Sequence, residues 1–308
     1  MHRFIIRRIL LLIPVLLGVM FVVFLLGYVA PGCPARVILG EAAPPEAIAQ
    51  LREQMGLDDP FLLQYVRFVY RAVQLDFGTS YQTGRDVFTE IFARFPNTLQ
   101  LAGMGIAIAI IGGIPLGIVS AVKQYTPFDF GATFFGLIWV SVPNFWLGML
   151  MIMLFTVTLQ WLPPTGFQEP LQWIMPTIAI GTNSFAILMR MTRSSMLECI
   201  RQDYIRTARA KGQKERVVIF RHALRNAMIP VTTVAGLQFG FLLGGAVLTE
   251  TIFAIPGMGS QLVSAIANRD FAVVRGGVLL IAVCFTVVNL AVDILYSFID
   301  PRIRSQYR

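Results

Sequence analysis

The feature that most constrains this chain is a series of apolar stretches, each about as long as the roughly 20 residues that a helix needs to cross a bilayer. Apolar residues make up 56% of the 308 residues, charged residues 14%, and the mean hydropathy is +0.69. Water-soluble globular proteins do not have this composition. The sequence therefore predicts an all-α polytopic membrane protein with six transmembrane helices, within Ile9–Arg36, Phe95–Val122, Phe130–Gln168, Pro170–Met189, Asn226–Thr249 and Gly276–Ile299.

The first of these intervals allows a second interpretation, a cleaved signal peptide. Arg3, Arg7 and Arg8 precede the apolar stretch, as they would in such a peptide. The stretch is longer than the apolar region of a typical signal peptide, and no A-x-A cleavage site follows it. We therefore expect it to remain as the first transmembrane helix.

The positive charges predict how the spans are oriented. With the N-terminus in the cytoplasm, 17 of the 25 Lys and Arg residues fall on the cytoplasmic side, ten of them in residues 190–225. Because short cytoplasmic loops are enriched in Lys and Arg, we expect both termini in the cytoplasm. The net charge of +8 then reflects topology. We expect no nucleic-acid partner, since no basic module with interleaved aromatic residues stands outside the membrane.

The spans divide the chain into four parts. Residues 1–30 form the cytoplasmic N-terminus and the first span, and residues 31–96 form a long extracytoplasmic connection. Apolar residues at helical spacing predict short helices in this connection, at Ala43–Gly56 and Phe61–Leu75, followed by turns over Asp76–Gly84. Residues 97–299 form a core of five spans that contains the charged loop 190–225. Residues 300–308 are a cytoplasmic tail.

Motifs for catalysis, nucleotide binding or metal binding are missing from the sequence. Cys33, Cys199 and Cys284 fall in three different segments, and no pair has metal-ligand spacing. There is no G-x-x-x-x-G-K-[ST] motif and no H-E-x-x-H motif. We therefore expect a non-catalytic membrane protein that holds no metal and no cofactor.

Polar and small residues inside the predicted spans have two interpretations. Asn144, Asn183 and Gln238 either line a path for a polar solute or join neighbouring helices by hydrogen bonds. Small residues recur every four positions in the fifth span and allow a close helix contact, within this chain or with a second chain; they are Gly236, Gly240 and Gly244. Asp293, in the last span, is either a functional charge or the partner of a loop Arg.

The charged loop predicts a helix between Glu198 and Lys211, because this stretch has neither Gly nor Pro. Ile200, Tyr204 and Ala208 share one stripe, Arg206 and Arg209 point to the other side, and Gly212 ends the helix in a left-handed conformation. A basic amphipathic helix of this kind either lies on anionic lipid or inserts into a groove of a cytoplasmic partner.

The loop resembles a known family at this point. The strings DYIRTARAKG (Asp203–Gly212) and RHALRNAMIP (Arg221–Pro230) are similar to the EAA…G loop of permeases of ATP-binding cassette importers, and most similar to the dipeptide/oligopeptide/nickel branch. Arg206 stands where the general pattern has an acid, and Arg225 where it has a Pro, which we interpret as marks of the peptide branch. SVPNFWLG (Ser141–Gly148) and ETIFAIPGMG (Glu250–Gly259) extend the resemblance along the chain, to the B-type permease subunit.

The resemblance implies a type I importer permease in a bacterial or archaeal cytoplasmic membrane, moving dipeptides or oligopeptides. Its implied partners are a second homologous permease, two ATP-binding subunits that hold ATP and Mg, an extracytoplasmic solute-binding protein and membrane lipids. The implied ATPase-coupling loop consists of Asp203, Tyr204, Arg206, Thr207, Ala208, Arg209, Ala210, Lys211 and Gly212. The implied outer gate or docking turn contains Pro256, Gly257 and Gly259. The alternative is a secondary transporter or channel that works without ATPase subunits.

Overall fold

The computed structural model describes residues 2–40 and 42–299, with side chains described for 9–40, 42–292 and 294. Apart from a single bridge between Thr79 and Asp86, the regular structure in this part is helical. Five segments are long and apolar enough to cross a membrane: Ile9–Val29, Val87–Val122, Pro170–Ile200, Glu215–Ile252 and Phe271–Val292. A sixth span is present if the bent pair Pro127–Ser141 and Asn144–Thr158 is counted as one. The prediction of six spans is therefore confirmed in the form of five continuous helices and one broken helix.

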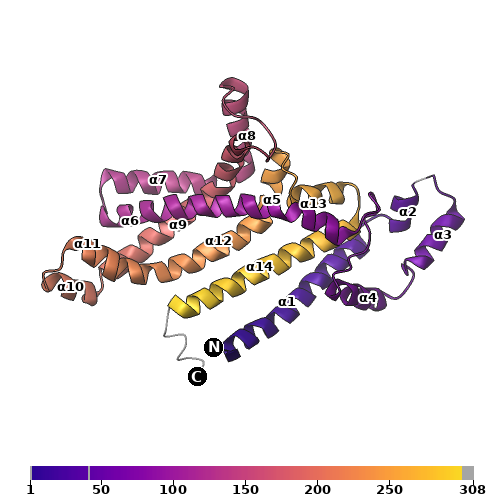
Figure 1. Cartoon of the computed structure of the whole chain (residues 1–308), viewed down its shortest axis with the longest axis horizontal. Helices are drawn as coiled ribbons and strands as arrows, with labels where there is room; N and C mark the ends of the chain where they lie inside the picture. The colour runs from indigo at the N-terminus through magenta and orange to yellow at the C-terminus, as the bar shows by residue number, and fades with distance from the viewer. Residues whose placement is uncertain (1, 41, 300–308) are drawn as a thin grey trace.

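The first span runs from near the middle of the molecule toward one end, where the short helices of the long connection lie (Figure 1). Helix α1 (His2–Val29) is followed by the short helices α2 (Pro34–Leu39), α3 (Pro45–Gln54) and α4 (Phe61–Val73). Helices α3 and α4 lie within the two stretches where the sequence predicts them. The aromatic rings of Phe24 and Phe68 stack with centroids 5.6 Å apart and fasten α4 to the outer end of α1.

The second span is one continuous rod and the third is broken. The rod consists of α5 (Val87–Ile108), a π-helical turn η1 (Ala109–Gly113) and α6 (Ile114–Val122). The third span consists of α7 (Pro127–Ser141), α8 (Asn144–Met151) and the π-helical segment η2 (Ile152–Thr158). Pro143 precedes α8, and the chain bends there by 99°. The α8 segment consequently projects away from the layer of α5, α9 and α12 (Figure 1).

Helix α9 (Pro170–Ile200) is the centre of the packing, against α5, α6, α7 and α12. Its contact with α5 depends on two glycines that face each other. A Cβ atom added at Gly181 would lie only 2.9 Å from the carbonyl oxygen of Gly105. The two helices can approach this closely because neither residue has a side chain. α9 ends eleven residues beyond the predicted fourth span.

The charged loop begins with α10 (Asp203–Ala210) and returns through α11 (Glu215–Val217) and the π-helical turn η3 (Val218–Ala223) into α12 (Leu224–Ile252). The single helix predicted from Glu198 to Lys211 is wrong. Residues Arg201 and Gln202 break it, and the chain turns there so that α10 folds back onto the ends of the spans.

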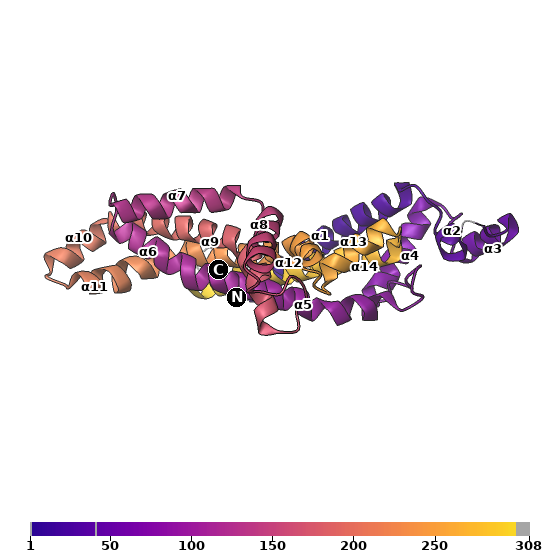
Figure 2. The same ribbon diagram turned by 90° about the horizontal axis from the view of Figure 1, so that it is seen from above.

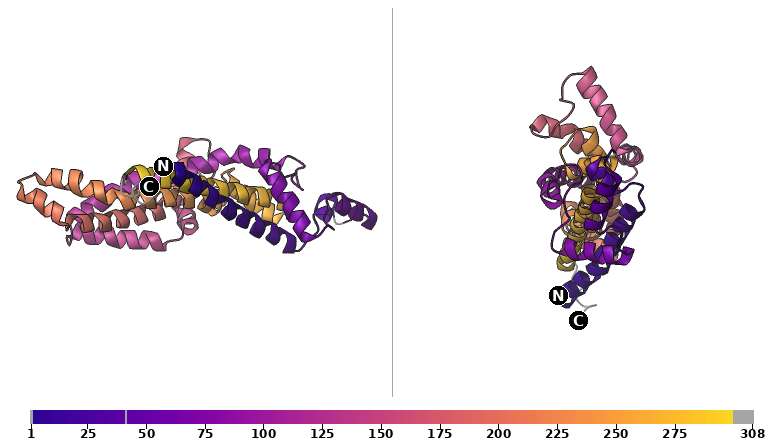
Figure 3. Two further views of the ribbon diagram at one scale, coloured as in Figure 1. Left: turned by 90° about the horizontal axis from the view of Figure 1, so that it is seen from below. Right: turned by 90° about the vertical axis from the view of Figure 1, so that its right-hand side faces the viewer.

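The chain ends with α13 (Met258–Ala267) and α14 (Phe271–Ile299). Helix α14 packs between α12 and α1, so that the last span joins the first to the core (Figure 3). Figure 2 shows the resulting elongated molecule, with α10 and α11 at one end and α2 and α3 at the other. The two regions that the sequence singles out on opposite sides of the membrane are therefore at opposite ends of the protein.

Candidate functional site

The helix of the charged loop, α10, rests on one end of the group of spans through one apolar edge. Ile205 and Ala208 are 0% and 7% exposed. They join a buried cluster formed by α6, α9, η3 and α12, which also contains Ala121, Met196, Val218, Ile219, Ala223 and Ala227. Burial of this edge fixes the orientation of α10 and leaves its opposite face accessible.

The buried edge differs from the predicted stripe in two places. Ile200 is the last residue of α9 and does not belong to α10, because the helix breaks after it. Ile205 takes the central buried position instead. Tyr204 is 41% exposed, and its hydroxyl accepts a hydrogen bond of 3.0 Å from Nδ2 of Asn226. Partial burial raises the pKa of this phenol. Tyr204 therefore ties α10 to the start of α12.

The turn after α10 is held by Gly212 and by an ion pair across it. Gly212 has φ +74°, the left-handed conformation expected from its sequence position. The sequence predicts that Arg209 points away from the apolar stripe. In the structure it pairs with Glu215, whose carboxylate oxygens lie 2.6 Å from its Nη2 and 3.1 Å from its Nε. This hydrogen bonding raises the pKa of Arg209. The ion pair joins the two arms of the loop on either side of the turn.

The face of α10 that points away from the protein is polar and mainly basic. The Arg206 side chain is 75% exposed and that of Asp203 is 95% exposed, and their charged atoms lie 3.6 Å apart. Such an exposed pair contributes little stability. The other exposed members of this face are Thr207, Ala210 and Lys211. The arrangement presents a helix with exposed charged side chains at one end of the molecule.

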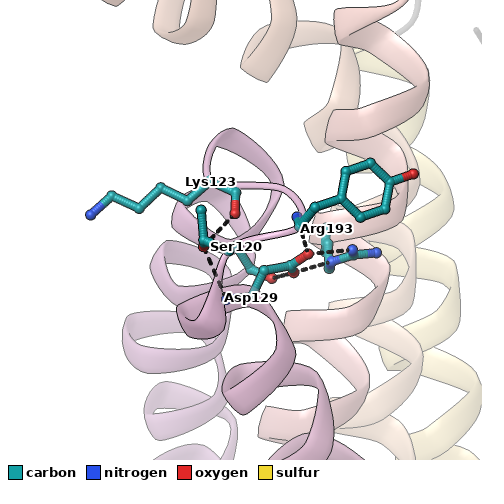
Figure 4. Close-up of polar contacts among 6 residues, drawn as sticks. Ser120, Lys123, Asp129 and Arg193 are labelled. Carbon is teal, nitrogen blue, oxygen red and sulfur yellow. Dashed lines mark hydrogen bonds and ion pairs between the residues drawn. The ribbon is translucent and has the colours of Figure 1, made fainter.

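A buried ion pair stabilises the same end of the protein (Figure 4). Asp129, at the start of α7, accepts hydrogen bonds from Nε and Nη2 of Arg193 on α9, at 2.6 and 2.8 Å. Ser120 Oγ and the Tyr125 backbone N–H also donate to this carboxylate. The Asp129 side chain is only 3% exposed. Four donors therefore hold the turn between α6 and α7 against α9.

The intramembrane amides predicted as pathway or packing residues bridge neighbouring helices where they have a partner. Nδ2 of Asn183 donates to the carbonyl oxygen of Val140, at 3.3 Å, which joins α9 to α7. Nε2 of Gln238 donates to Oγ of Ser184, also at 3.3 Å, which joins α12 to α9. Asn144 begins α8 directly after the bend at Pro143. The amides of Asn183 and Gln238 therefore lie at the contacts of α9 with α7 and with α12.

The three glycines that recur every four positions in α12 face a helix of the same chain. A Cβ atom at Gly236 would overlap Val292 of α14, and one at Gly240 would lie 2.9 Å from Phe285. A Cβ atom at Gly244 would lie 3.8 Å from Ile281. Helix α14 therefore occupies this face, which leaves no room there for a second chain. Asp293 follows on α14, and its side chain lies outside the described residues.

The turn that the sequence predicts as an outer gate or docking element, called the outer turn below, is built around a fully buried carboxylate. Glu250, near the end of α12, is 0% exposed. Its Oε1 accepts a hydrogen bond of 2.6 Å from Oγ1 of Thr98 on α5, and its Oε2 accepts one of 2.9 Å from the backbone N–H of Ser260 on α13. The Thr98 hydroxyl in turn accepts from the backbone N–H of Met258, at 2.9 Å. Glu250 thus connects three helices, α5, α12 and α13, at the end of the core opposite α10.

The predicted outer-turn residues fit closely around this carboxylate. A side chain at Gly257 would overlap the Glu250 carboxylate, and a Cβ atom at Gly259 would lie 2.6 Å from Cα of Val247. The carbonyl oxygen of Pro256 accepts a hydrogen bond of 2.9 Å from Nδ2 of Asn97. Both glycines are therefore required by close packing, and the turn is fixed to α5 and to α12.

Sequence reasoning missed both Asp129 and Glu250. It began the third predicted span just after Asp129 and ended the fifth just before Glu250, because it treated each charge as the boundary of a span. The structure places both inside helices, where hydrogen-bond donors from other elements satisfy them. A usable signal was present, since each acid directly adjoins an apolar stretch and has a turn motif with Pro or Gly nearby.

Among the residues whose side chains the structure describes, 9–40, 42–292 and 294, no group of three or more His, Cys, Asp or Glu residues is placed to hold a metal ion. Cys33, Cys199 and Cys284 are free thiols.

Comparison with family models gives two neighbouring matches that together cover most of the chain. Residues 1–102 match the N-terminal part of the binding-protein-dependent transport system membrane component, and residues 113–305 match the binding-protein-dependent transport system inner membrane component. The two matches meet within the α5–α6 rod, so they do not correspond to separate structural domains.

Curated relatives match over their full length. The chain is 45% identical to the dipeptide transport system permease protein DppB of Alkalihalophilus pseudofirmus, over 97% of this chain and 98% of the relative. It is 43% identical to the glutathione transport system permease protein GsiC of Salmonella paratyphi A, over 99% of each chain. Among solved structures, an inward-facing MetNI methionine ABC transporter matches with a TM-score of 0.54 and 17% identity, over 68% of this chain and 96% of that one. This last match shows a shared permease fold.

Proposed function

The chain belongs to the family of binding-protein-dependent transport system inner membrane components, and we propose that it carries dipeptides or oligopeptides into the cell. As a permease component of an ATP-binding cassette importer it is a multi-pass inner membrane protein without catalytic activity, and ATP is handled by partner subunits. Family membership sets aside the alternative of a transporter that works without ATPase subunits. The peptide class rests on the relatives, which transport dipeptides and glutathione according to their names.

In this proposal the exposed face of α10 binds the ATPase. The observation that supports it best is the division of α10 into a buried edge, Ile205 and Ala208, and a charged outer face around Arg206. A helix fixed on one side and open on the other transmits force from a partner to the spans beneath it. The remaining residues of the predicted coupling loop are Asp203, Tyr204, Thr207, Arg209, Ala210, Lys211 and Gly212.

The positive charge of the α10 end also supports the proposed orientation. Ten Lys and Arg residues lie between Arg190 and Arg225, with three acids. Because Lys and Arg are enriched in cytoplasmic loops, this end faces the cytoplasm and α2 to α4 face outward. Both chain termini then lie on the cytoplasmic side.

The pathway in this proposal runs along the contacts of α9 with α7 and with α12, where Asn183 and Gln238 form their hydrogen bonds. Asn144, at the start of α8, belongs to the same pathway. A second homologous permease completes it. Leu237 and Phe241 of α12 are 45% and 59% exposed and are available to such a subunit. The turn of Pro256, Gly257 and Gly259 forms the outer gate or the docking element for the solute-binding protein.

A charge reversal tests the coupling role of α10. Arg206→Glu changes an exposed side chain, so the protein should fold normally while the ATPase contact loses at least about tenfold in affinity. Arg36→Glu, an exposed arginine at the opposite end, is the matched control. The measurement is recovery of ATP-binding subunits and ATPase activity with a tagged chain in mild detergent. Equal recovery with Arg206→Glu and Arg36→Glu would remove α10 from the interface.

A charge at Ala208 gives a different result, because that residue is buried in the chain's own cluster. Ala208→Asp should lower the amount of folded protein in the membrane, and not only the ATPase recovery. The substrate class is tested separately, by uptake of labelled dipeptides into proteoliposomes that contain the assembled importer and its binding protein. An assembled, ATP-hydrolysing importer that accepts no peptide would reject the substrate class and leave the coupling proposal standing.

A further inference from the structure

A cleft of about 400 Å³ lies in the outer layer, away from α9 and from the outer turn. It opens between the outer end of α1, helix α4, the turn that begins at Asp76 and the start of α14. The residues that matter for its chemistry are Phe24, Arg67, Phe68, Arg71, Asp76 and Arg275. Three guanidinium groups therefore face one small space at the membrane boundary.

Arg275 is the innermost of these cations. Its guanidinium carbon lies 5.7 Å from the ring centroid of Phe24 and 5.5 Å from that of Phe68. Its Nη2 donates to the hydroxyl of Tyr81, at 3.0 Å, and its Nε donates to the carbonyl oxygen of Phe271, at 3.1 Å. Within the described part of the chain no carboxylate forms an ion pair with it. A partly buried cation with only neutral partners is a ready site for an anion.

Arg71, on α4 at the mouth of the cleft, adds a second positive charge that has no ion-pair partner among the described residues. It is exposed. The third arginine, Arg67, is already matched, because its Nη2 lies 2.9 Å from the Asp59 carboxylate. Asp76 is the one acid of the lining, and its Oδ1 accepts a hydrogen bond from the backbone N–H of Gly78. The net charge of the residues that line the cleft is therefore positive.

The surface of α4 indicates the depth at which the cleft lies. Its inner side packs on α1, but its outer side exposes a continuous apolar face made of Leu62, Leu63, Val66, Tyr70 and Val73, each between 48% and 74% exposed. An amphipathic helix with such a face lies in the interfacial layer of a membrane, with its basic residues at the level of the lipid headgroups. The neighbouring end of α1 is equally apolar, since Leu26 and Val29 are 66% and 71% exposed.

We propose that this cleft binds the phosphate headgroup of an anionic phospholipid of the outer leaflet. Arg71 and Arg275 bind the phosphate, and the acyl chains lie along the exposed apolar residues of α1 and α4. A soluble anion of the same charge would be held by the arginines alone. A lipid gains the apolar contacts as well, which is why the structure favours the lipid.

The test uses the full transporter in dodecyl maltoside, with short-chain dioctanoylphosphatidylglycerol as the probe and thermal stabilisation as the readout. Wild-type protein should be stabilised by this lipid in a saturable way. Arg71→Gln should raise the apparent Kd about tenfold, the loss of one charge-assisted contact. Arg36→Gln, an exposed arginine of α2 outside the cleft, should leave the Kd unchanged. Arg71 has no internal partner among the described residues, so its variant should fold normally.

Two further ligands separate the lipid from other sources of the same charge. Dioctanoylphosphatidylcholine carries a phosphate but no net charge, and it should bind more weakly than dioctanoylphosphatidylglycerol. Glycerol phosphate carries the anion without the chains, and it should bind more weakly still. Comparable binding of glycerol phosphate and the lipid would overturn the proposal in favour of a soluble anion. Equal effects of Arg71→Gln and Arg36→Gln would overturn it in favour of general surface charge.

Discussion

Replacement of Glu250 tests whether the buried carboxylate holds the outer end of the core together. Glu250→Leu removes the acceptor for two donors, the buried Thr98 hydroxyl and the partly buried Ser260 N–H. Each unmatched buried donor costs about 1–3 kcal/mol, so the variant should lose about 2–6 kcal/mol of unfolding free energy. Glu250→Gln keeps the size and one carbonyl oxygen, and should lose only about 1 kcal/mol.

The assay is thermal unfolding of the purified transporter in detergent, followed by tryptophan fluorescence. Glu250→Leu should lower the Tm by about 5 °C or more, because a loss of 1 kcal/mol shifts the Tm of a chain this size by a few degrees. Glu53→Leu makes the same substitution at an exposed carboxylate of α3, and should leave the Tm unchanged. Peptide uptake, measured in parallel, should fall with Glu250→Leu because the outer turn loses its anchor.

A double substitution distinguishes this network from a general packing effect. Thr98→Val removes the donor to Glu250 and the acceptor for Met258 N–H. If the residues act as one network, Thr98→Val combined with Glu250→Leu should cost less than the sum of the two single changes. Strict additivity, or a Glu250→Leu protein that unfolds at the wild-type temperature, would refute the argument that the carboxylate joins α5, α12 and α13.

Two other predictions concern the core. Asp129→Ala leaves the Arg193 guanidinium without its carboxylate and should lower the unfolding free energy by about 2–4 kcal/mol in thermal unfolding. Combining it with Arg193→Met should cost less, because no unpaired charge remains. An equal or larger cost for the double variant would contradict the pairing. Gly236→Leu should prevent α14 from packing on α12, because even a Cβ atom there overlaps Val292, and should lower the yield of monodisperse protein. Gly18→Leu, where a Cβ atom meets nothing within 4 Å, is its control, and similar yields from both variants would contradict the packing.

The sequence predicts the spans because hydrocarbon length and apolar composition determine them almost locally. It also predicts the left-handed turn at Gly212, which depends on the backbone of a single residue. It does not predict the 99° bend at Pro143, because a proline marks only a possible break and tertiary contacts decide the angle. Similarly, Arg201 and Gln202 have no strong helix-breaking tendency, and α10 turns there because Ile205 gains a buried position.

The missed acids have a common physical reason. A charge in a span is unfavourable when it is considered alone, so one predicted apolar stretch begins after Asp129 and another ends before Glu250. Their partners come from segments distant in the chain: Arg193 lies 64 residues beyond Asp129, and Thr98 lies 152 residues before Glu250. Only the folded arrangement shows that these acids are satisfied.

Helix α12 carries contacts with both functional ends of the molecule. Near its start, Asn226 binds Tyr204 of α10, and the preceding turn η3 packs on the buried edge of the same helix. Near its other end, Glu250 holds the outer turn. The segment from Glu215 to Ile252 forms one continuous helical element. In the proposed function, a displacement of α10 by the ATPase therefore moves the base of the element that anchors the outer turn. This direct connection gives the two ends a physical means of coupling that needs no chain of weak intermediate contacts.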